Sequence, residues 1–221
     1  MNIYIDTAVK GCNIALFDQD NIWASVQESI ERGHAEAILP LYEDLMQSIG
    51  KKPQDIENVY VNVGPGSFTG LRVGLSVARF IGFSLDVPVH GVTSFQAFSA
   101  HVKGDQSRCV VVETKRSDFY VQMFDKNHDV LSDPQSISAN DVATMLVDYP
   151  DCIITGDAVD RLITEVPNLT QETQQQEMIS IDDVLMAIQS GDLKTIEPNA
   201  FYIRDADVSQ PKNKAIPQQH S

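Results

Sequence analysis

Cysteine is scarce in this chain, which contains three among 221 residues. Cys12, Cys109 and Cys152 lie in separate apolar runs, and none belongs to a CxxC pair or to a Cys/His spacing that would bind a metal. This spacing indicates neither a disulfide framework nor a zinc site. We therefore expect reduced thiols that are buried in the core of a cytoplasmic protein.

Basic residues are few as well. Sixteen lysines and arginines stand against 31 aspartates and glutamates, which gives a formal net charge of −15. A chain of this charge repels phosphate backbones unless a local basic patch overrides the field. The basic runs at residues 51–52 and 115–116 are only pairs. Strong, direct binding of nucleic acid by this chain alone is therefore not expected.

Long apolar runs are missing too. No stretch of about 18 apolar residues indicates a transmembrane helix, and the first residues, "MNIYIDTAVKG", lack the basic and apolar regions of a signal peptide. We therefore expect a cytoplasmic protein without a membrane partner.

Strand-like and helical patterns follow the same order in both halves of the chain. Strands are predicted in the first half at residues 2–7, 12–17, 22–29, 58–63 and 87–92. Helical spacing occurs there at residues 34–50, 70–84 and 93–102. The second half has strands at 109–114, 118–124, 128–133 and 152–157, and helices at 138–149, 158–166 and 180–191. The order β-β-β-α-β-α, found twice, predicts an α/β fold with two lobes, the duplicated ribonuclease H-like arrangement of actin-like ATPases.

The same order sets the expected domains. We predict an N-terminal lobe at residues 1–104, a reduced C-terminal lobe at 105–209, and a loose polar tail at 210–221.

A glycine loop, "GPGSFTG" (residues 64–70), joins a strand to a long apolar segment. Backbone N–H groups in such a loop can bind an anion. The candidate contacts for a nucleotide or anion are Asp6, Thr7, Gly64, Gly66 and Ser67. The loop has no lysine and matches neither GxGxxG nor GxxxxGK[ST]. The alternative is a tight turn that needs glycine dihedrals.

The segment after the loop predicts a helix that is apolar around most of its circumference. Gly70, Gly74, Ala78 and Gly82 recur at every fourth position and form a stripe of small residues. Such a helix needs cover on several sides, which a partner, the second lobe or the preceding helix could supply. The predicted partner interface consists of Gly70, Leu71, Val73, Gly74, Leu75, Val77, Ala78, Ile81 and Gly82, with Ile38, Leu41 and Leu45 from the preceding helix.

The run "VNVGPGSFTGLRVGLSVARFIG" closely resembles the signature of the TsaB (YeaZ) family. "IYIDTA", "RGHAEAILPLYEDLM", "VPVHGVTSFQAFSA" and "NAFYIRDADV" resemble further segments of that family. The resemblance is good over residues 1–124 and adequate over 197–208. One segment departs from it: "ETKRSDFY" stands where the family commonly has Asp-Ala-Arg-Arg.

The resemblance implies a subunit of the machinery that makes threonylcarbamoyladenosine (t6A) beside the tRNA anticodon. The family pairs with its catalytic paralogue TsaD through the helices His34–Ile49 and Gly70–Ser84, and an ATPase, TsaE, joins the complex. It also implies a homodimer through the same surface when the chain is alone, tRNA contact mainly through the partners, and ATP or ADP at the interface with TsaD rather than an intrinsic cofactor.

Catalytic residues are harder to identify. TsaD has a metal-binding His-x-x-x-His pair where this chain has Ser94 and Phe98, so we assign no metal site and no catalytic residue. A stand-alone ATP-dependent phosphotransferase using Asp6 and Asp157 is the alternative. A peptidase is less favoured, because Ser67 is outside a GxSxG elbow and has no assignable His/Asp pair.

Overall fold

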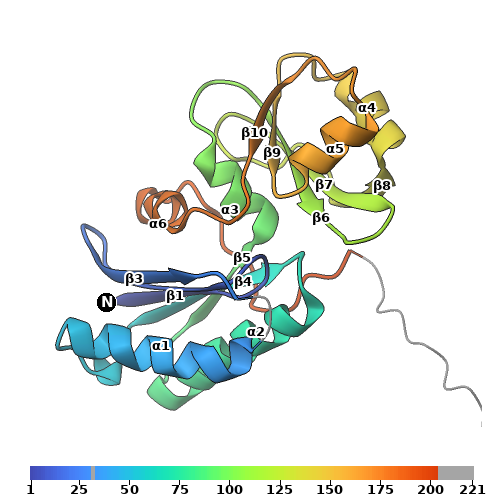
Figure 1. Cartoon of the computed structure of the whole chain (residues 1–221). Coiled ribbons are helices and arrows are strands. Elements are labelled where there is room, and N and C mark those ends of the chain that lie inside the picture. Colours follow the sequence, from blue (N-terminus) through green and yellow to red (C-terminus); the bar gives the residue numbers. More distant parts are fainter. Residues whose placement is uncertain (31–32, 204–221) are drawn as a thin grey trace, which may run out of the picture.

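The computed structural model describes residues 1–30 and 33–203, and within them two five-stranded mixed sheets form two lobes (Figure 1). The strands of the first sheet are β1 (Asn2–Asp6), β2 (Cys12–Phe17), β3 (Ile22–Glu28), β4 (Asn58–Gly64) and β5 (Val89–Thr93). Their order is β3-β2-β1-β4-β5. The β1–β2–β3 meander is antiparallel, whereas β1, β4 and β5 are parallel.

The second sheet repeats this topology. Its strands are β6 (Arg108–Glu113), β7 (Asp118–Phe124), β8 (Gln135–Ser138), β9 (Ile153–Gly156) and β10 (Glu172–Gln175). Their order, β10-β9-β6-β7-β8, is the first sheet's order read from the other edge. The predicted duplicated, two-lobed α/β fold is therefore confirmed. The strand predicted at residues 128–133 is wrong: an isolated bridge between Val130 and Phe124 forms there, and the strand lies seven residues later. β10, which is polar, was not predicted.

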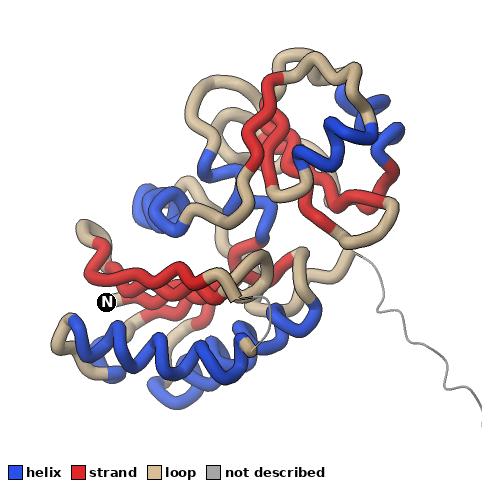
Figure 2. Tube along the Cα trace, viewed as in Figure 1, coloured by secondary structure: helices blue, strands red, loops and turns tan. Residues whose placement is uncertain are grey.

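The helices form three layers around the sheets (Figures 1 and 2). They are α1 (His34–Ser48), α2 (Phe68–Leu85), α3 (Ser94–His101), α4 (Ala139–Leu146), α5 (Val159–Glu165) and α6 (Ile181–Ser190), with a short 3₁₀ helix, η1 (Pro53–Asp55). α1 and α2 cover the outer face of the first sheet, and α3 and α6 lie between the sheets. α4 and α5 cover the second sheet. α1 continues through Pro40, although proline has no backbone N–H to donate; Pro40 is exposed, so water can solvate the carbonyl that loses its partner.

The chain returns to the first lobe after the second sheet. Gln27 donates a hydrogen bond to the Ile179 carbonyl, and Lys10 forms an ion pair with Glu177 at 2.9 Å. Further on, residues 196–203, here called the strap, run beside β5 and α2. Gly91 and Ile196 exchange two backbone hydrogen bonds of 2.7 and 2.9 Å, which cover the edge of the first sheet. The tail predicted at residues 210–221 lies outside the described residues.

The small residues of α2 face the chain's own sheet. A Cβ at Gly70 would lie 1.8 Å from the Thr7 carbonyl oxygen, and one at Gly74 would lie 2.6 Å from the Thr7 hydroxyl. At Gly82 it would lie 2.3 Å from a methyl group of Val89. Ala78, the remaining member of the stripe, is fully buried. The prediction that this stripe receives a partner is therefore wrong, because β1 and β5 already occupy it.

This packing also explains the composition of α2. Among the described residues, α2 is the one helix long and apolar enough to meet a length and composition criterion for crossing a membrane, which the sequence reading did not expect. Only 39% of that 18-residue window is buried in the structure. A helix that packs glycines and alanine on a sheet and leaves large apolar side chains on its other side has the same overall hydropathy.

The close contact at Gly70 gives a stability prediction. Gly70→Ala should lower the free energy of unfolding by on the order of 3 kcal/mol, because the new methyl group overlaps the Thr7 carbonyl. Helix propensity alone would favour alanine by about 1 kcal/mol, so steric overlap decides the sign. Urea denaturation measures the change. Ser76→Ala, at an exposed position of the same helix, is the matched control and should be neutral or slightly stabilising; an equally stable Gly70→Ala protein would contradict the packing.

Candidate functional site

The glycine loop lies directly on the turn between β1 and β2. Ser67 N–H donates to the Ala8 carbonyl at 2.6 Å, and the Thr7 hydroxyl donates to the Gly70 carbonyl at 2.7 Å. A Cβ at Gly66 would be 2.1 Å from the Ala8 carbonyl oxygen. Glycine is thus required here for close approach of two backbones, and the loop covers the turn that follows the first strand.

The loop's N–H groups are largely engaged within the chain. Gly64 N–H donates to the Asn62 side chain at 2.8 Å, and Gly70 N–H donates to the Ser67 hydroxyl, the N-cap of α2, at 3.2 Å. Ser67 N–H is bound to Ala8, as described above. Two of the loop residues predicted to contact an anion, Gly64 and Ser67, therefore use their N–H groups to hold the loop to its own strand and turn.

Asp6 and Thr7, the other predicted anion contacts, are buried beneath this loop. Asp6 accepts a hydrogen bond from Ala8 N–H at 2.8 Å. Burial raises the pKa of the Asp6 carboxyl above its ordinary value, and the Ala8 hydrogen bond partly opposes that rise. Oδ1 of Asp6 thus caps a backbone turn, whereas Oδ2 is buried without a hydrogen-bond partner among the described residues.

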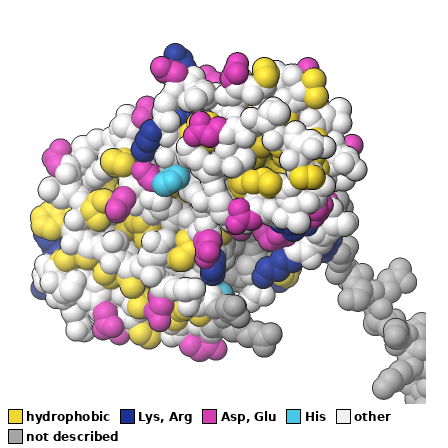
Figure 3. All heavy atoms as spheres, turned by 45° about the horizontal axis from the view of Figure 1, so that its top comes forward, with side chains coloured by type: hydrophobic (Ala, Val, Ile, Leu, Met, Phe, Trp, Pro, Cys, Tyr) yellow, Lys and Arg dark blue, Asp and Glu magenta, His cyan; other side chains and the backbone are white. Residues whose placement is uncertain are grey.

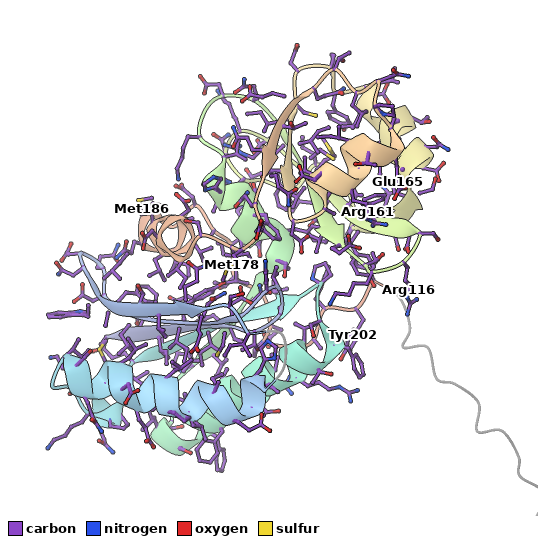
Figure 4. All side chains as sticks on the ribbon, in the orientation of Figure 1. Arg116, Arg161, Glu165, Met178, Met186 and Tyr202 are labelled. Atoms are coloured by element: carbon purple, nitrogen blue, oxygen red, sulfur yellow. The ribbon has the colours of Figure 1, made fainter. Side chains whose placement is uncertain are left out.

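The corresponding turn of the second lobe is closed by side chains. Glu113, at the end of β6, accepts from Lys115 N–H at 2.5 Å and pairs with Arg161 Nε at 3.0 Å. The Arg161 guanidinium lies 3.8 Å from the centre of the Phe119 ring and also donates to the Arg116 carbonyl at 2.6 Å. Figure 4 shows Arg161 and Glu165 together on α5. The "ETKRSDFY" segment, which departs from the family pattern, thus supplies the carboxylate of an ion pair whose cation, Arg161, lies on α5.

Asp157 completes this closed turn. Its Oδ1 accepts a hydrogen bond from Glu113 N–H at 2.8 Å. Burial raises the pKa of Asp157 from 3.8 to about 6, and the hydrogen bond from Glu113 opposes part of that rise. One oxygen of each carboxylate that a phosphotransferase would use, Asp6 Oδ1 and Asp157 Oδ1, therefore accepts from a backbone N–H group.

The positions aligned with metal-binding histidines point into the core. Ser94 is fully buried and donates to Asn62 Oδ1 at 3.0 Å, and Phe98 is fully buried between the two sheets. Within residues 1–30 and 33–203, no group of three or more His, Cys, Asp or Glu side chains is arranged to hold a metal ion.

An apolar groove of about 410 Å³ runs between α1 and α2 on the outer side of the first lobe. Its lining residues are Ala35, Leu39, Phe68, Thr69, Arg72, Val73, Ser76 and Val77. Further along α2, Phe80 and Phe83 are 67% and 90% exposed. We call the groove together with Phe80 and Phe83 the α1–α2 surface.

The predicted interface residues only partly reach this surface. Val73 and Val77 line the groove, and Leu41 is half-buried. The other nine are buried in the first lobe itself: Gly70, Leu71, Gly74, Leu75, Ala78, Ile81, Gly82, Ile38 and Leu45. The residues that sequence reasoning missed are Leu39, Phe68, Phe80 and Phe83. The signal was present, because Phe80 and Phe83 lie beside Ser76 and Arg79, on the side of the helix opposite the small stripe.

The strap contacts Phe68, one of the residues that line the groove. Phe201 N–H donates to the Val63 carbonyl at 2.8 Å, which holds the strap against the end of β4. The next ring, Tyr202, packs on Phe68 with 5.9 Å between ring centres, at the start of α2 (Figure 4). The strap therefore fixes the aromatic side chain that opens the groove.

Comparison with known proteins identifies the family. A family model described as "TsaD: tRNA N6-adenosine threonylcarbamoyltransferase" matches residues 24–180. The chain belongs to this family. Within it, curated relatives named "tRNA threonylcarbamoyladenosine biosynthesis protein TsaB" are 27% identical in Bacillus subtilis, over 58% of this chain, and 33% identical in Escherichia coli, over 43% of it. The chain spans about half the length of the curated relatives it matches, 56% and 41% respectively. The recognition of a TsaB (YeaZ) protein is confirmed.

Solved structures confirm the fold of this TsaB-family chain. "YeaZ from Pseudomonas aeruginosa" has a TM-score of 0.74 at 19% identity, covering 91% of this chain and 98% of that one. A second Pseudomonas aeruginosa structure, described as an uncharacterized protein with similarity to peptidase YEAZ, has a TM-score of 0.76 at 20% identity and covers 92% and 99% of the two chains.

The closed turn of the second lobe gives a pH prediction. Because the pKa of Asp157 is higher in the folded state than the ordinary 3.8, folding binds its proton more tightly. The resulting stability is present below pH 3.8 and is lost as the pH rises to about 6. Asp157→Asn removes this titration, so above pH 6 the variant should gain up to about 3 kcal/mol over the wild type, and near pH 4 the gain should shrink toward zero.

Urea unfolding of both proteins at several pH values measures this difference. Asp105→Asn is the matched control, because Asp105 is an exposed carboxylate of the same chain. A difference between wild type and Asp157→Asn that stays constant with pH would contradict the assignment.

Proposed function

We propose that this chain is a non-catalytic subunit of the t6A machinery, which binds and activates a TsaD-type catalytic subunit. The observation that carries the proposal is the exposed α1–α2 surface. Leu39, Phe68, Phe80 and Phe83 are 48%, 42%, 67% and 90% exposed on two adjacent helices. Contiguous exposed apolar side chains of this kind mark a protein interaction site, and a groove between helices suits an amphipathic helix of a partner.

The geometry elsewhere supports a partner rather than an independent enzyme. The glycine loop covers the turn after β1, and Glu113 and Arg161 close the corresponding turn after β6. Ser94 and Phe98 fill core positions where the TsaD resemblance has metal-binding histidines. Chemistry on the threonylcarbamoyl group is thus assigned to the TsaD-type subunit.

The remaining partners follow from charge and from the resemblance. On the face shown in Figure 3, lysines and arginines are scattered among acidic side chains rather than gathered into a patch. With a net charge of −15, the chain leaves tRNA contact mainly to its partners. We place it in the cytoplasm, with a TsaE-type ATPase in the same complex, ATP or ADP at the interface with TsaD, and a homodimer through the α1–α2 surface when the partner is absent.

Reconstitution tests the proposal. The chain, its TsaD-type and TsaE-type partners, tRNA and the threonylcarbamoyl donor should yield t6A, and omission of the chain should abolish the product. Leu39→Asp should weaken binding to the TsaD-type subunit by about 30-fold or more, because it places a charge in an apolar groove. Val147→Asp, at a 76% exposed position of the second lobe, is the matched control and should bind normally.

Two results would count against this function. Unchanged t6A formation without the chain would remove the subunit role. ATP turnover by the chain alone, lost on Asp6→Asn, would instead establish the phosphotransferase alternative.

A further inference from the structure

The α1–α2 groove contains one charged side chain. Of its eight lining residues, Arg72 is the cation and none is acidic. This composition is unusual in a chain with almost twice as many acidic as basic residues. A partner that fills the groove must therefore cover a cation as well as an apolar wall.

The second arginine of α2, Arg79, has hydrogen-bond partners on the strap, whereas Arg72 has no ion-pair partner among the described residues. Arg79 follows Arg72 by two helical turns and donates to the Pro198 carbonyl at 2.6 Å and to Asn199 Oδ1 at 2.8 Å. It is thus occupied in holding the strap. No ion pair within residues 1–30 and 33–203 involves Arg72.

Arg72 is nevertheless held in place. Its guanidinium lies 3.8 Å from the centre of the Phe68 ring, and Phe68 in turn packs on Tyr202 of the strap. Stacking leaves the N–H edge of the guanidinium available, and that planar edge matches a carboxylate through two parallel hydrogen bonds. The ordering of the side chain therefore precedes binding, which lowers the entropic cost of using it.

Burial decides the chemistry of the occupant. When a partner covers the groove, Arg72 loses water, and an uncompensated buried cation is costly. A partner carboxylate would replace that water, whereas an entirely apolar partner would leave the charge unpaired. We propose that the α1–α2 groove receives a helix of the TsaD-type subunit in which an Asp or Glu, flanked by apolar side chains, pairs with Arg72. This inference rests on the proposed function.

The experiment measures binding of the purified TsaD-type subunit by calorimetry without nucleotide, at about 50 and about 500 mM NaCl. Arg72→Glu should weaken binding by about 30-fold or more, because two carboxylates would then meet in the groove. Arg72→Lys should recover part of the affinity, since it keeps the charge without the planar edge. Lys126→Glu, an exposed charge reversal in the second lobe, is the matched control and should bind normally.

A charge reversal on the partner completes the test. Exposed Asp and Glu residues on the partner's helices are changed singly to Lys, and one of these changes should restore binding to the Arg72→Glu chain. All variants of this chain should unfold in urea like the wild type, because Arg72 is exposed in the free protein.

The outcomes separate this inference from the function on which it rests. Normal binding by Arg72→Glu, with binding abolished by Leu39→Asp, would overturn the acidic partner and keep the groove. Normal binding by both variants would overturn the docking surface itself. If Arg72 variants bind the partner normally without nucleotide, and only the gain in affinity caused by ATP is lost, the anion that Arg72 binds is a phosphate and the inference is wrong. The inference is likewise wrong if the variants lose only a gain in affinity caused by tRNA.

Discussion

The contact between α2 and the turn after β1 is the constraint on which the rest of the first lobe depends. Two glycines, Gly66 and Gly70, let the loop and the helix lie against the carbonyl groups of Ala8 and Thr7. The backbones are so close there that a Cβ on either glycine would overlap the facing carbonyl oxygen. The Thr7 hydroxyl and Ser67 N–H then lock this arrangement. Because the small face of α2 is used here, Phe80 and Phe83, on the opposite side of the helix, face outward.

One packing choice therefore has two functional effects. It covers the turn that follows the first strand, and it turns Phe80 and Phe83 toward solvent. In the second lobe, the corresponding turn is also covered by the chain itself, because Glu113 of the turn forms an ion pair with Arg161 of α5. These two features are the ones that the proposed function uses: both turns are filled by the chain's own residues, and the apolar surface is left open to a partner.

Sequence reasoning reached the fold because periodicity and glycine spacing are local signals. Strand alternation and helical spacing placed most elements, and the loop was correctly weighed as a possible rigid turn. Periodicity shows which residues share a helix face but not which neighbour covers that face, so Gly74 and Ala78 were assigned to a partner instead of β1. The polar β10 carries no apolar pattern, and the strap, which has no secondary structure around Phe201, was visible only as a family motif.

The groove's charge also bears on the choice between a partner and a second copy of the chain. In a two-fold symmetric pair formed through this groove, the same patch meets itself, and neither copy offers a lining carboxylate to Arg72. Each copy also carries a net charge of −15, so the pair is opposed over a longer range. A heterologous helix with an acidic residue removes the local penalty and keeps the apolar contacts. Under the proposed function, the apolar side chains attract both a catalytic partner and a second copy of the chain. The unpaired cation Arg72 makes the groove favour the catalytic partner.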